Sequence, residues 1–550
     1  MTDRPAEAEP LVREDSGVSE STDPAPTPVS SDIVSGGEFP ASRYTRSVFD
    51  ALLRARAKHG GDKIAIIDAD GRELTYDQIV QGSFALGNAL RKGRGSKEKV
   101  AILLPTGAGA ALAFFAVQAY GRIPAMLNFT AGAKALKAAC RAAEAKVIVT
   151  ARKFIELGEL QPLVDQLSEE LDFIYLEDIR DNLGPMDKAM ALIGTVAPWA
   201  IKSRPNPHDT AVVLFTSGTE GDPKGVALSH VNLVSNVEQA AAHVDIYETD
   251  IVFNPLPTFH CFGLTGGLLL PLLVGVPAVL HPTPLQAKTI AKRVGETKAT
   301  VLFATDTFLG QYARSAQKED LASLRMAVCG AERVRDETRS LVRRQFNLEI
   351  LEGYGATEAA PVVAVNQPGR NRPGTVGRLM PGMEGRLEPV EGIDRGGRLM
   401  IRGPNIMQGY IYTTNPGVIV PLDGGWHDTG DIVTFDEENC ITIRGRLKRF
   451  AKLGGEMVSL AVVENCATSL WPENLHAAVT LSDSRKGEQI VLVTDYDQAD
   501  RGDFVGFARN HGIAELAVPK RIVRVSEVPV LGTGKIDYVG VEKLAKAELG

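Results

Sequence analysis

A segment between Leu214 and His230 carries residues whose types and spacing suit phosphate chemistry. The apolar residues 212–215 predict a buried strand, and three hydroxyl residues follow it: Thr216, Ser217 and Thr219. Three glycines would let the backbone approach an anion closely: Gly218, Gly221 and Gly225. Lys224 adds a positive charge for a polyphosphate, while the Walker spacing G-x-x-x-x-G-K-[ST] is absent. We predict a strand leading into a phosphate-binding loop of another nucleotide chemistry, with a polar surface turn as the alternative.

Four further segments carry side chains that could complete a nucleotide site. Residues 330–332 (GAE) and 352–358 (EGYGATE) are Gly-rich turns after apolar runs. The second turn offers an aromatic ring, which can cover a base, and a carboxylate, which can hold Mg²⁺ that bridges phosphates. Residues 426–431 (WHDTGD) place Asp431 in a tight turn suited to ribose hydroxyls, and residues 531–535 (LGTGK) place Lys535 on a glycine loop. Taken singly, each segment is as consistent with a structural turn as with a site.

The elements that must position these residues follow an alternating pattern. Short β-rich runs are separated by helical stretches such as 110–120; the runs are 99–104, 145–150, 211–215 and 300–303. This alternation predicts an α/β domain with largely parallel sheets. The uncharged block 263–280 approaches transmembrane length, but its two prolines and four glycines favour a buried helix followed by a buried strand.

The predicted secondary-structure pattern of the chain changes twice after this α/β region. Near Arg395 the sequence turns to short antiparallel strands with tight turns, which indicates a β-rich subdomain. After Arg446 about one hundred residues suffice for a small α+β domain. Residues 1–40 are rich in Pro, Ser, Glu and Asp and predict a disordered tail. We therefore expect a tail over 1–40, an N-terminal domain over 41–447 and a mobile C-terminal domain over 448–550.

Composition limits the classes of function. The chain has 550 residues, a net charge of −8 and 44% hydrophobic residues, so it predicts a globular protein and does not indicate nucleic-acid binding. Five cysteines without a C-x-x-C pair argue against a disulfide framework and a zinc site. The N-terminus has neither a basic start nor an apolar stretch, which argues against a signal or transit peptide. A cytoplasmic protein is expected.

In their order and approximate spacing, the five segments resemble the adenylate-forming superfamily of acyl-CoA synthetases, luciferases and peptide-synthetase adenylation domains. The resemblance covers residues 45 to 545. Runs such as LEGYGATEAAPVVAVNQP, GPNIMQGY and GRLKRFAKLGGEMVSLAVVE are most similar to the acyl-[acyl carrier protein] synthetase half of the bifunctional 2-acylglycerophosphoethanolamine acyltransferase/acyl-[acyl carrier protein] synthetases. The acyltransferase half of those proteins would need an H-x-x-x-x-D motif. No His of this chain has an Asp five residues later, so we expect only the synthetase half.

The resemblance implies roles for the matching residues. ATP phosphates would lie against the loop residues Thr216, Ser217, Gly218, Thr219, Gly221 and Lys224. Adenine would stack on Tyr354, close to Gly330, Ala331, Glu332, Gly353 and Gly355. Thr357 would contact the α-phosphate and Glu358 the Mg²⁺, while Asp431 and Arg446 would hold the ribose. Lys448 would be the hinge and Lys535 the lysine that neutralises charge on the carboxylate, so the expected catalytic residues are Lys535, Lys224 and Glu358. Glu220 departs from the Thr or Ser found in most of the superfamily, which leaves its role open.

The expected reaction joins a long-chain fatty acid to a phosphopantetheine thiol through an acyl-adenylate. The acyl pocket would include His260, Phe262 and Gly263, although a packed core histidine is an alternative for His260. Basic residues in 444–452 would steer either an acidic acyl carrier protein, which the resemblance favours, or coenzyme A. Peripheral contact with the inner membrane is a further hypothesis. A luciferase-like enzyme would keep the same motifs, whereas a non-enzymatic relative would be expected to lack Lys535 or Glu358.

Overall fold

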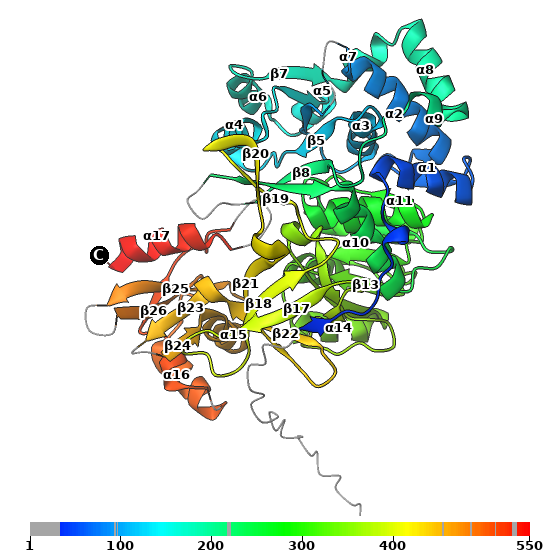
Figure 1. Cartoon of the computed structure of the whole chain (residues 1–550). Coiled ribbons are helices and arrows are strands. Elements are labelled where there is room, and N and C mark those ends of the chain that lie inside the picture. The colour runs from blue at the N-terminus through cyan, green and yellow to red at the C-terminus, as the bar shows by residue number, and fades with distance from the viewer. Residues whose placement is uncertain are drawn as a thin grey trace, which may run out of the picture.

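The computed structural model describes residues 33–92, 95, 97–216, 222–453, 456–483, 487–511, 513–530 and 536–549. Four of the predicted phosphate-loop residues and the predicted catalytic lysine lie outside this range: Ser217, Gly218, Thr219, Gly221 and Lys535. Glu220 also lies outside it. The described chain forms two large mixed sheets, an antiparallel sheet and a small C-terminal α+β unit (Figure 1).

The first mixed sheet has eight strands and forms the upper part of the molecule in Figure 1. In spatial order its strands are β20 (Asn415–Pro421), β19 (Gly409–Tyr412), β9 (Lys224–Ser229), β8 (Thr210–Thr216), β5 (Ile123–Met126), β4 (Lys99–Ile102), β6 (Val147–Thr150) and β7 (Asp172–Tyr175). Strands β8, β5, β4, β6 and β7 are parallel neighbours, and every residue of β5 and β6 is buried. Burial on both faces is what parallel strands with continuous apolar runs require.

Helices cover this sheet and connect its parallel strands. They are α2 (Tyr76–Leu90), α3 (Ala108–Ala119), α4 (Gly132–Ala143), α5 (Arg152–Leu157), α6 (Gln161–Leu167), α7 (Leu176–Asp181), α8 (Pro185–Val196) and α9 (Pro198–Ile201). Helix α3 consists of AGAALAFFAVQA and is buried along nearly its whole length, between α2 and the strands β4 and β5. The fold therefore places an almost entirely apolar helix at the centre of this half of the molecule.

The second mixed sheet has nine strands. In spatial order they are β16 (Arg378–Leu379), β15 (Val362–Val365), β14 (Glu349–Gly355), β13 (Met326–Cys329), β12 (Val301–Ala304), β10 (Val252–Asn254), β11 (Ala278–Leu280), β2 (Ile64–Ile67) and β3 (Glu73–Thr75). Its central strands are parallel and its edges antiparallel. Its helices are α1 (Val48–His59), α10 (His230–His243), α11 (Leu270–Val274), α12 (Ala287–Glu296), α13 (Asp306–Ser315) and α14 (Asp336–Phe346).

The uncharged block 263–280 is folded into this second half. It forms the π-helix η2 (Phe262–Leu269), then α11 and the buried strand β11, as the helix-then-strand prediction required. No helix in the described part of the chain has both the length and the apolar character needed to cross a membrane.

The antiparallel sheet comprises β1 (Val34–Ser35), β17 (Glu384–Glu388), β18 (Gly397–Arg402), β21 (His427–Phe435) and β22 (Ile441–Arg446). It is the β-rich subdomain expected near Arg395. Strand β1 pairs with β17 through Val34 and Gly385, so the chain joins the fold before residue 40. The expected tail over residues 1–40 is therefore too long at its C-terminal end, because a two-residue edge strand leaves no hydrophobic pattern to detect.

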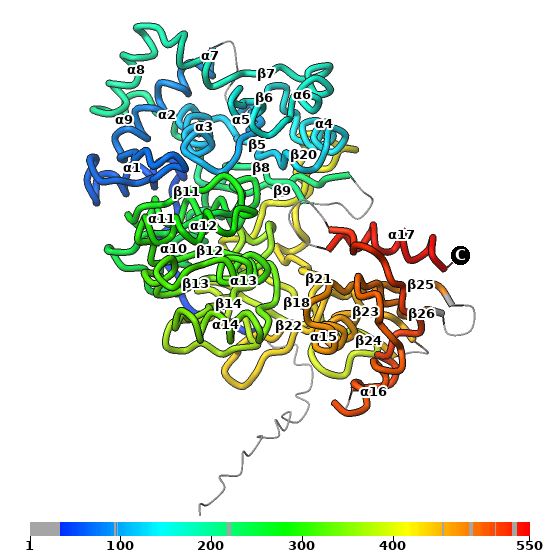
Figure 2. Tube along the Cα trace, turned by 180° about the vertical axis from the view of Figure 1, so that it is seen from behind, coloured from blue at the N-terminus to red at the C-terminus, as the bar shows by residue number. Residues whose placement is uncertain are grey.

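The C-terminal unit begins where β22 ends. Its sheet contains β24 (Glu456–Ser459), β23 (Phe450–Leu453), β26 (Gly487–Thr494), β25 (His476–Asp483) and β27 (Arg521–Arg524). Its helices are α15 (Leu460–Leu470), α16 (Arg501–Asn510) and α17 (Tyr538–Leu549), and Figure 2 shows the unit beside the antiparallel sheet. The expected hinge Lys448 is exposed and lies in the short 3-10 turn Leu447–Arg449 between the two sheets. Movement about it stays a prediction.

Candidate active site

A large cavity lies where the three N-terminal sheets meet. Its volume is about 1480 Å³, and its lining includes Thr216 at the end of β8, Tyr354 near the end of β14 and Arg446 at the end of β22. Carboxyl ends of parallel strands are the usual location of ligand sites in such sheets. Predicted residues from distant parts of the chain line it together: Thr216, His260, Phe262, Gly330, Ala331, Gly353, Tyr354, Gly355, Thr357, Glu358 and Arg446.

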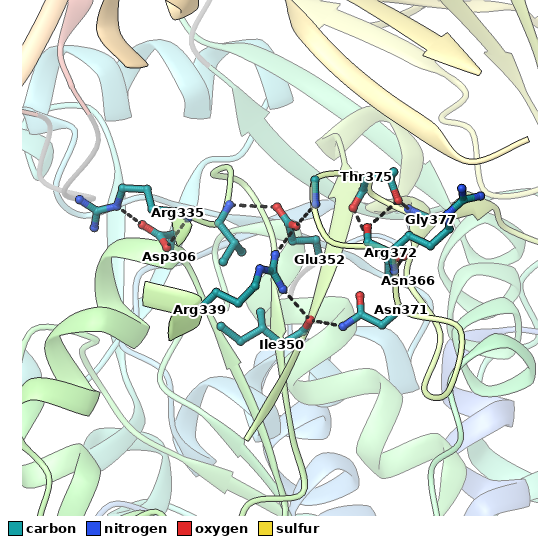
Figure 3. A network of polar contacts seen from close by, with 12 residues as sticks. Asp306, Arg335, Arg339, Ile350, Glu352, Asn366, Asn371, Arg372, Thr375 and Gly377 are labelled. Atoms are coloured by element: carbon teal, nitrogen blue, oxygen red, sulfur yellow. Dashed lines mark hydrogen bonds and ion pairs between the residues drawn. The ribbon is translucent and has the colours of Figure 1, made fainter. Parts of the chain in front are cut away.

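A network of buried carboxylates fixes the loop that follows β13 (Figure 3). Glu352 accepts hydrogen bonds from the backbone N–H of Val334 at 3.0 Å and from the Arg339 guanidinium at 2.6 Å. Asp306 accepts from the backbone N–H of Arg335 at 3.0 Å. Because both carboxylates are almost fully buried, removing either partner would leave an unpaired charge. The network therefore holds the 330–335 loop against β14, beside the cavity.

Tyr354 and Asp431 form a buried pair beside the cavity. The Tyr354 hydroxyl donates to Asp431 Oδ2 at 2.5 Å, and Arg446 Nε lies 3.2 Å from Asp431 Oδ1. Burial, followed by the negative charge of Asp431, raises the pKa of the Tyr354 hydroxyl, so it remains a donor. Burial also raises the pKa of the Asp431 carboxyl, an effect that Arg446 opposes. Each carboxylate oxygen keeps a second acceptor site, which ribose hydroxyls could use.

Glu358 and Lys224 are joined through one aromatic side chain. The Tyr410 hydroxyl donates to Glu358 Oε1 at 2.7 Å, and the Lys224 ammonium lies 5.1 Å from the centre of the Tyr410 ring. The neighbouring ring of Tyr412 lies 5.6 Å from the same ammonium, since positions two apart on β19 share a face. Burial and the charge of Glu358 raise the pKa of Tyr410, which keeps its proton. Tyr410 thus positions an anion and a cation at once.

The predicted acyl segment touches the predicted nucleotide segment at two points. Cys261 Sγ lies 3.4 Å from the Thr357 hydroxyl. The ring of Phe262 approaches Gly330 so closely that a Cβ there would lie 3.4 Å from it. The two predicted halves of the site therefore meet beside Thr357, which is where a carboxylate and an α-phosphate would have to meet.

Some predicted residues lie beside the cavity without lining it. Gly263 is buried, and a Cβ built on it would lie 2.2 Å from the carbonyl oxygen of Pro257, so its role is close packing of η2. Glu332 accepts a hydrogen bond from the backbone N–H of Thr307 at 3.0 Å, at the start of α13. Lys224 and Asp431 reach the site through Tyr410 and Tyr354.

The basic cluster of residues 444–452 is only partly available to a ligand. Arg449 pairs with Glu464 at 2.6 Å and lies 3.7 Å above the Tyr538 ring, inside the C-terminal unit. Lys452 lies 3.7 Å from Glu391. Arg444, Arg446 and Lys448 are exposed. Because Arg446 also pairs with Asp431, whereas the Lys452–Glu391 pair is fully at the surface, steering of an acidic acceptor would depend mainly on Arg444, Lys448 and Lys452.

Glu358 is the carboxylate that lies among the predicted nucleotide residues of the cavity lining, and it could hold Mg²⁺. Glu358 lines the cavity, and its second oxygen remains available beside the one that accepts from Tyr410. Among the described residues, no group of three or more His, Cys, Asp and Glu side chains could hold a metal ion. A single carboxylate fits Mg²⁺, which keeps several waters and binds through one or two carboxylates plus substrate phosphates.

Comparison with known proteins identifies the architecture. The profile described as "AMP-binding enzyme" matches residues 53–411, more than half of the chain. The chain belongs to the AMP-binding enzyme family. Its resemblance to the adenylate-forming superfamily and the expectation of an enzyme are thereby confirmed. The medium-chain fatty-acid–CoA ligase of Escherichia coli K12 is 27% identical over 86% of this chain and 86% of its own. The long-chain-fatty-acid–CoA ligase of Bacillus subtilis 168 is 27% identical over 88% and 92%.

Solved structures of this AMP-binding enzyme fold confirm the expected architecture. ATP-bound MatB from Rhodopseudomonas palustris superposes with a TM-score of 0.76 at 22% identity, covering 91% of this chain and 100% of that one. The anthranilate CoA ligase AuaEII, in complex with anthranoyl-AMP, gives 0.76 at 22% identity over 92% and 100%. The α/β fold, with a large N-terminal part and a small C-terminal α+β unit, is therefore established.

Two parts of the site were absent from the sequence prediction. Tyr410 was recognised only as part of the run GPNIMQGY, although two tyrosines at positions two apart on a strand are a detectable signal for one shared face. Three residues of α10 also line the cavity: Asn236, Val237 and Ala240. Their helix has ordinary amphipathic periodicity, so the sequence offers nothing that separates them from core positions.

Proposed function

We propose that this AMP-binding enzyme is a fatty acid–CoA ligase that forms an acyl-adenylate from ATP. One observation carries the proposal: most of the described nucleotide residues and two of the three predicted acyl residues, His260 and Phe262, line one cavity, and the two segments meet at Thr357 and Cys261. The apolar part of the lining, which includes Val237, Leu256 and Phe303, suits an alkyl chain. Burial of such a chain yields about 0.8 kcal/mol per methylene.

Coenzyme A is better supported as the acceptor than the acyl carrier protein expected from the sequence. Both curated relatives named above are CoA ligases by name. Acyl carrier protein is the alternative acceptor, and the experiment described below tests it beside coenzyme A.

The proposed chemistry has two steps on one site. A carboxylate oxygen of the fatty acid attacks the α-phosphorus, and pyrophosphate leaves as the bond to the bridging oxygen breaks. Thr357 would donate to the α-phosphate and Lys224 would neutralise the phosphates, while Lys535 would balance charge on the carboxylate. Mg²⁺, held by Glu358 with phosphate oxygens and water, would supply further charge neutralisation. In the second step the thiol sulfur attacks the acyl carbon and AMP leaves.

The second step would require rearrangement of the small C-terminal unit about Lys448, so that a thiol reaches the acyl carbon. Lys448 lies in the short turn between the two sheets, which is where a few residues could absorb such a change. No residue of the chain has to form a covalent intermediate.

The test supplies purified protein with ATP and Mg²⁺ and with octanoate, laurate or palmitate. One series of tubes contains coenzyme A and the other contains holo acyl carrier protein. Acyl-CoA formation supports the proposal, and the preferred acid reports the usable depth of the cavity. Acylation of the carrier protein alone would overturn the choice of acceptor. Pyrophosphate release without either thioester would show that both acceptors are wrong, and an oxygen-dependent product would indicate the luciferase-like alternative.

A further inference from the structure

Helix α8 packs on the molecule through one narrow face. Asp187, Ala191 and Gly194 are its buried residues, at the spacing of a single helical stripe. A Cβ built on Gly194 would lie 2.1 Å from the ring of Phe84 in α2, so the two helices are in close contact. This contact fixes which side of α8 faces outward.

The outward side of α8 and the short helix α9 is apolar. It carries five large hydrophobic side chains with exposed fractions from 41% to 70%: Met186, Leu192, Ile193, Val196 and Trp199. We refer to these five residues as the α8–α9 ridge. A helix that is apolar on both faces is expected to be covered on both, and a contiguous exposed apolar patch marks an interaction surface. Figures 1 and 2 both show α8 at the outer edge of the molecule.

Within residues 184–206, which carry the ridge, the exposed charges are of one sign, and two exposed carboxylates of the preceding helix α7, Asp178 and Asp181, are paired with Arg152 and Arg180. Asp187 is the only carboxylate between Gly184 and Asn206, and it is buried against Asn88 and Lys92, at 2.7 and 3.1 Å. Lys188 and Arg204 are exposed. An apolar helix face flanked by a tryptophan and basic side chains is complementary to a membrane surface with anionic headgroups.

The ridge also adjoins an opening of the cavity. Ile179, Arg180 and Leu183, immediately before α8, line the cavity. The Arg180 side chain is 72% exposed, so the cavity reaches the surface close to the start of α8. A membrane surface in contact with the ridge would therefore lie beside this opening of the cavity.

We propose that the α8–α9 ridge docks this enzyme on an anionic lipid surface. The docking is independent of the reaction; only the idea that a fatty acid enters the cavity from the membrane rests on the proposed function. The side chains of the ridge would enter the boundary between headgroups and acyl chains, with Lys188 and Arg204 at the level of the headgroups.

The test is flotation of the full chain with vesicles of phosphatidylcholine, with or without phosphatidylglycerol. The double variant Leu192→Glu/Val196→Glu places two charges on the ridge, and Val539→Glu is the matched control, because Val539 is a 64% exposed helical valine in the C-terminal unit. We expect the wild type and the control to float with anionic vesicles, and the double variant to lose about tenfold or more of the bound fraction. Thermal unfolding of all three proteins checks that they are folded.

A second measurement does not depend on the double variant. Tryptophan emission of the wild type should shift to shorter wavelength when anionic vesicles are added. Trp199→Phe should abolish the shift, since Trp471 is buried and the half-buried Trp426 is covered by the guanidinium groups of Arg386 and Arg402. Absence of vesicle binding by the wild type, or equal binding by the double variant, would overturn the proposal. A dimer that the double variant dissociates, without vesicle binding, would show that a second copy of the chain covers the ridge. Acyl-CoA formation from acid in solution is measured separately, so failure of the reaction and failure of docking are distinguishable.

Discussion

The Tyr410 hydroxyl donates to the Glu358 carboxylate at 2.7 Å, and the Tyr410 ring at the same time lies under the Lys224 ammonium. The hydroxyl and the ring have separable functions, because one holds the carboxylate proposed to bind Mg²⁺ and the other holds the lysine proposed to bind phosphate. Strand β19, which carries Tyr410, pairs with β9, which carries Lys224, so the sheet itself sets this distance.

Tyr410→Phe keeps the ring and removes the hydroxyl. We expect kcat/KM for ATP to fall about tenfold, because a hydrogen bond to a charged group contributes roughly 1.5–3 kcal/mol. The concentration of Mg²⁺ needed for half-maximal rate should rise as well. Tyr412→Phe is the control, since it preserves the second ring near Lys224. An unchanged Mg²⁺ requirement in Tyr410→Phe would show that the hydroxyl does not position Glu358 for the metal.

Tyr354→Phe tests the nucleotide side of the cavity. The change leaves the ring that is proposed to stack on adenine but removes the donor to the buried Asp431. We expect KM for ATP to rise about tenfold while kcat changes less, because a buried acceptor left without its partner costs about 1–3 kcal/mol. Tyr76→Phe is a matched control, because Tyr76 is buried like Tyr354 and its hydroxyl donates a hydrogen bond, in this case to the backbone carbonyl of Leu272. Tyr76 does not line the cavity. That variant should lose stability without a change in KM.

The sequence predicted the scaffold better than the site. Alternating apolar runs located the central strands, and the ordered motifs located the residues that line the cavity, since both depend on local patterns. The pairing of Tyr410 with Glu358 joins residues 52 positions apart, and no local pattern reports it. The outward face of α8 also escaped prediction, because an apolar helix looks like a core helix until its packing partner is known.

Gly263 shows a second limit of reading the sequence. Its position after Phe262 suggested a pocket residue, yet its Cβ site is occupied by the carbonyl oxygens of Pro257 and Leu256, at 2.2 and 2.7 Å. Gly263→Ala should therefore displace η2 and destabilise the protein by about 2 kcal/mol or more, with loss of activity for every acid tested. Gly506→Ala in α16 is the control, since nothing lies within 4 Å of its Cβ site. That substitution should stabilise the protein by about 0.5–1 kcal/mol. A Gly263→Ala protein of normal stability that prefers shorter acids would restore the pocket role.

His230 gives the fold a pH dependence with a definite sign. It lies at the start of α10, where its Nδ1 accepts the backbone N–H of Val48 at 3.2 Å, and burial lowers its pKa from 6.5 to about 4. Between these values the unfolded chain takes up a proton that the folded chain does not, so stability falls as pH decreases from 6.5 to about 4. At 1.36 kcal/mol per pKa unit the loss approaches about 3 kcal/mol. His281, whose pKa burial also lowers to about 4, acts in the same direction.

His230→Asn supplies an acceptor for the Val48 N–H without a titrating group. We expect the thermal midpoint of this variant to depend less on pH between 6.5 and 4 than that of the wild type, with the remaining slope contributed in part by His281. His208→Asn, at an exposed position, is the matched control for the replacement of a histidine by asparagine. If His230→Asn retains the full wild-type slope, His230 is not the group whose protonation is excluded by folding.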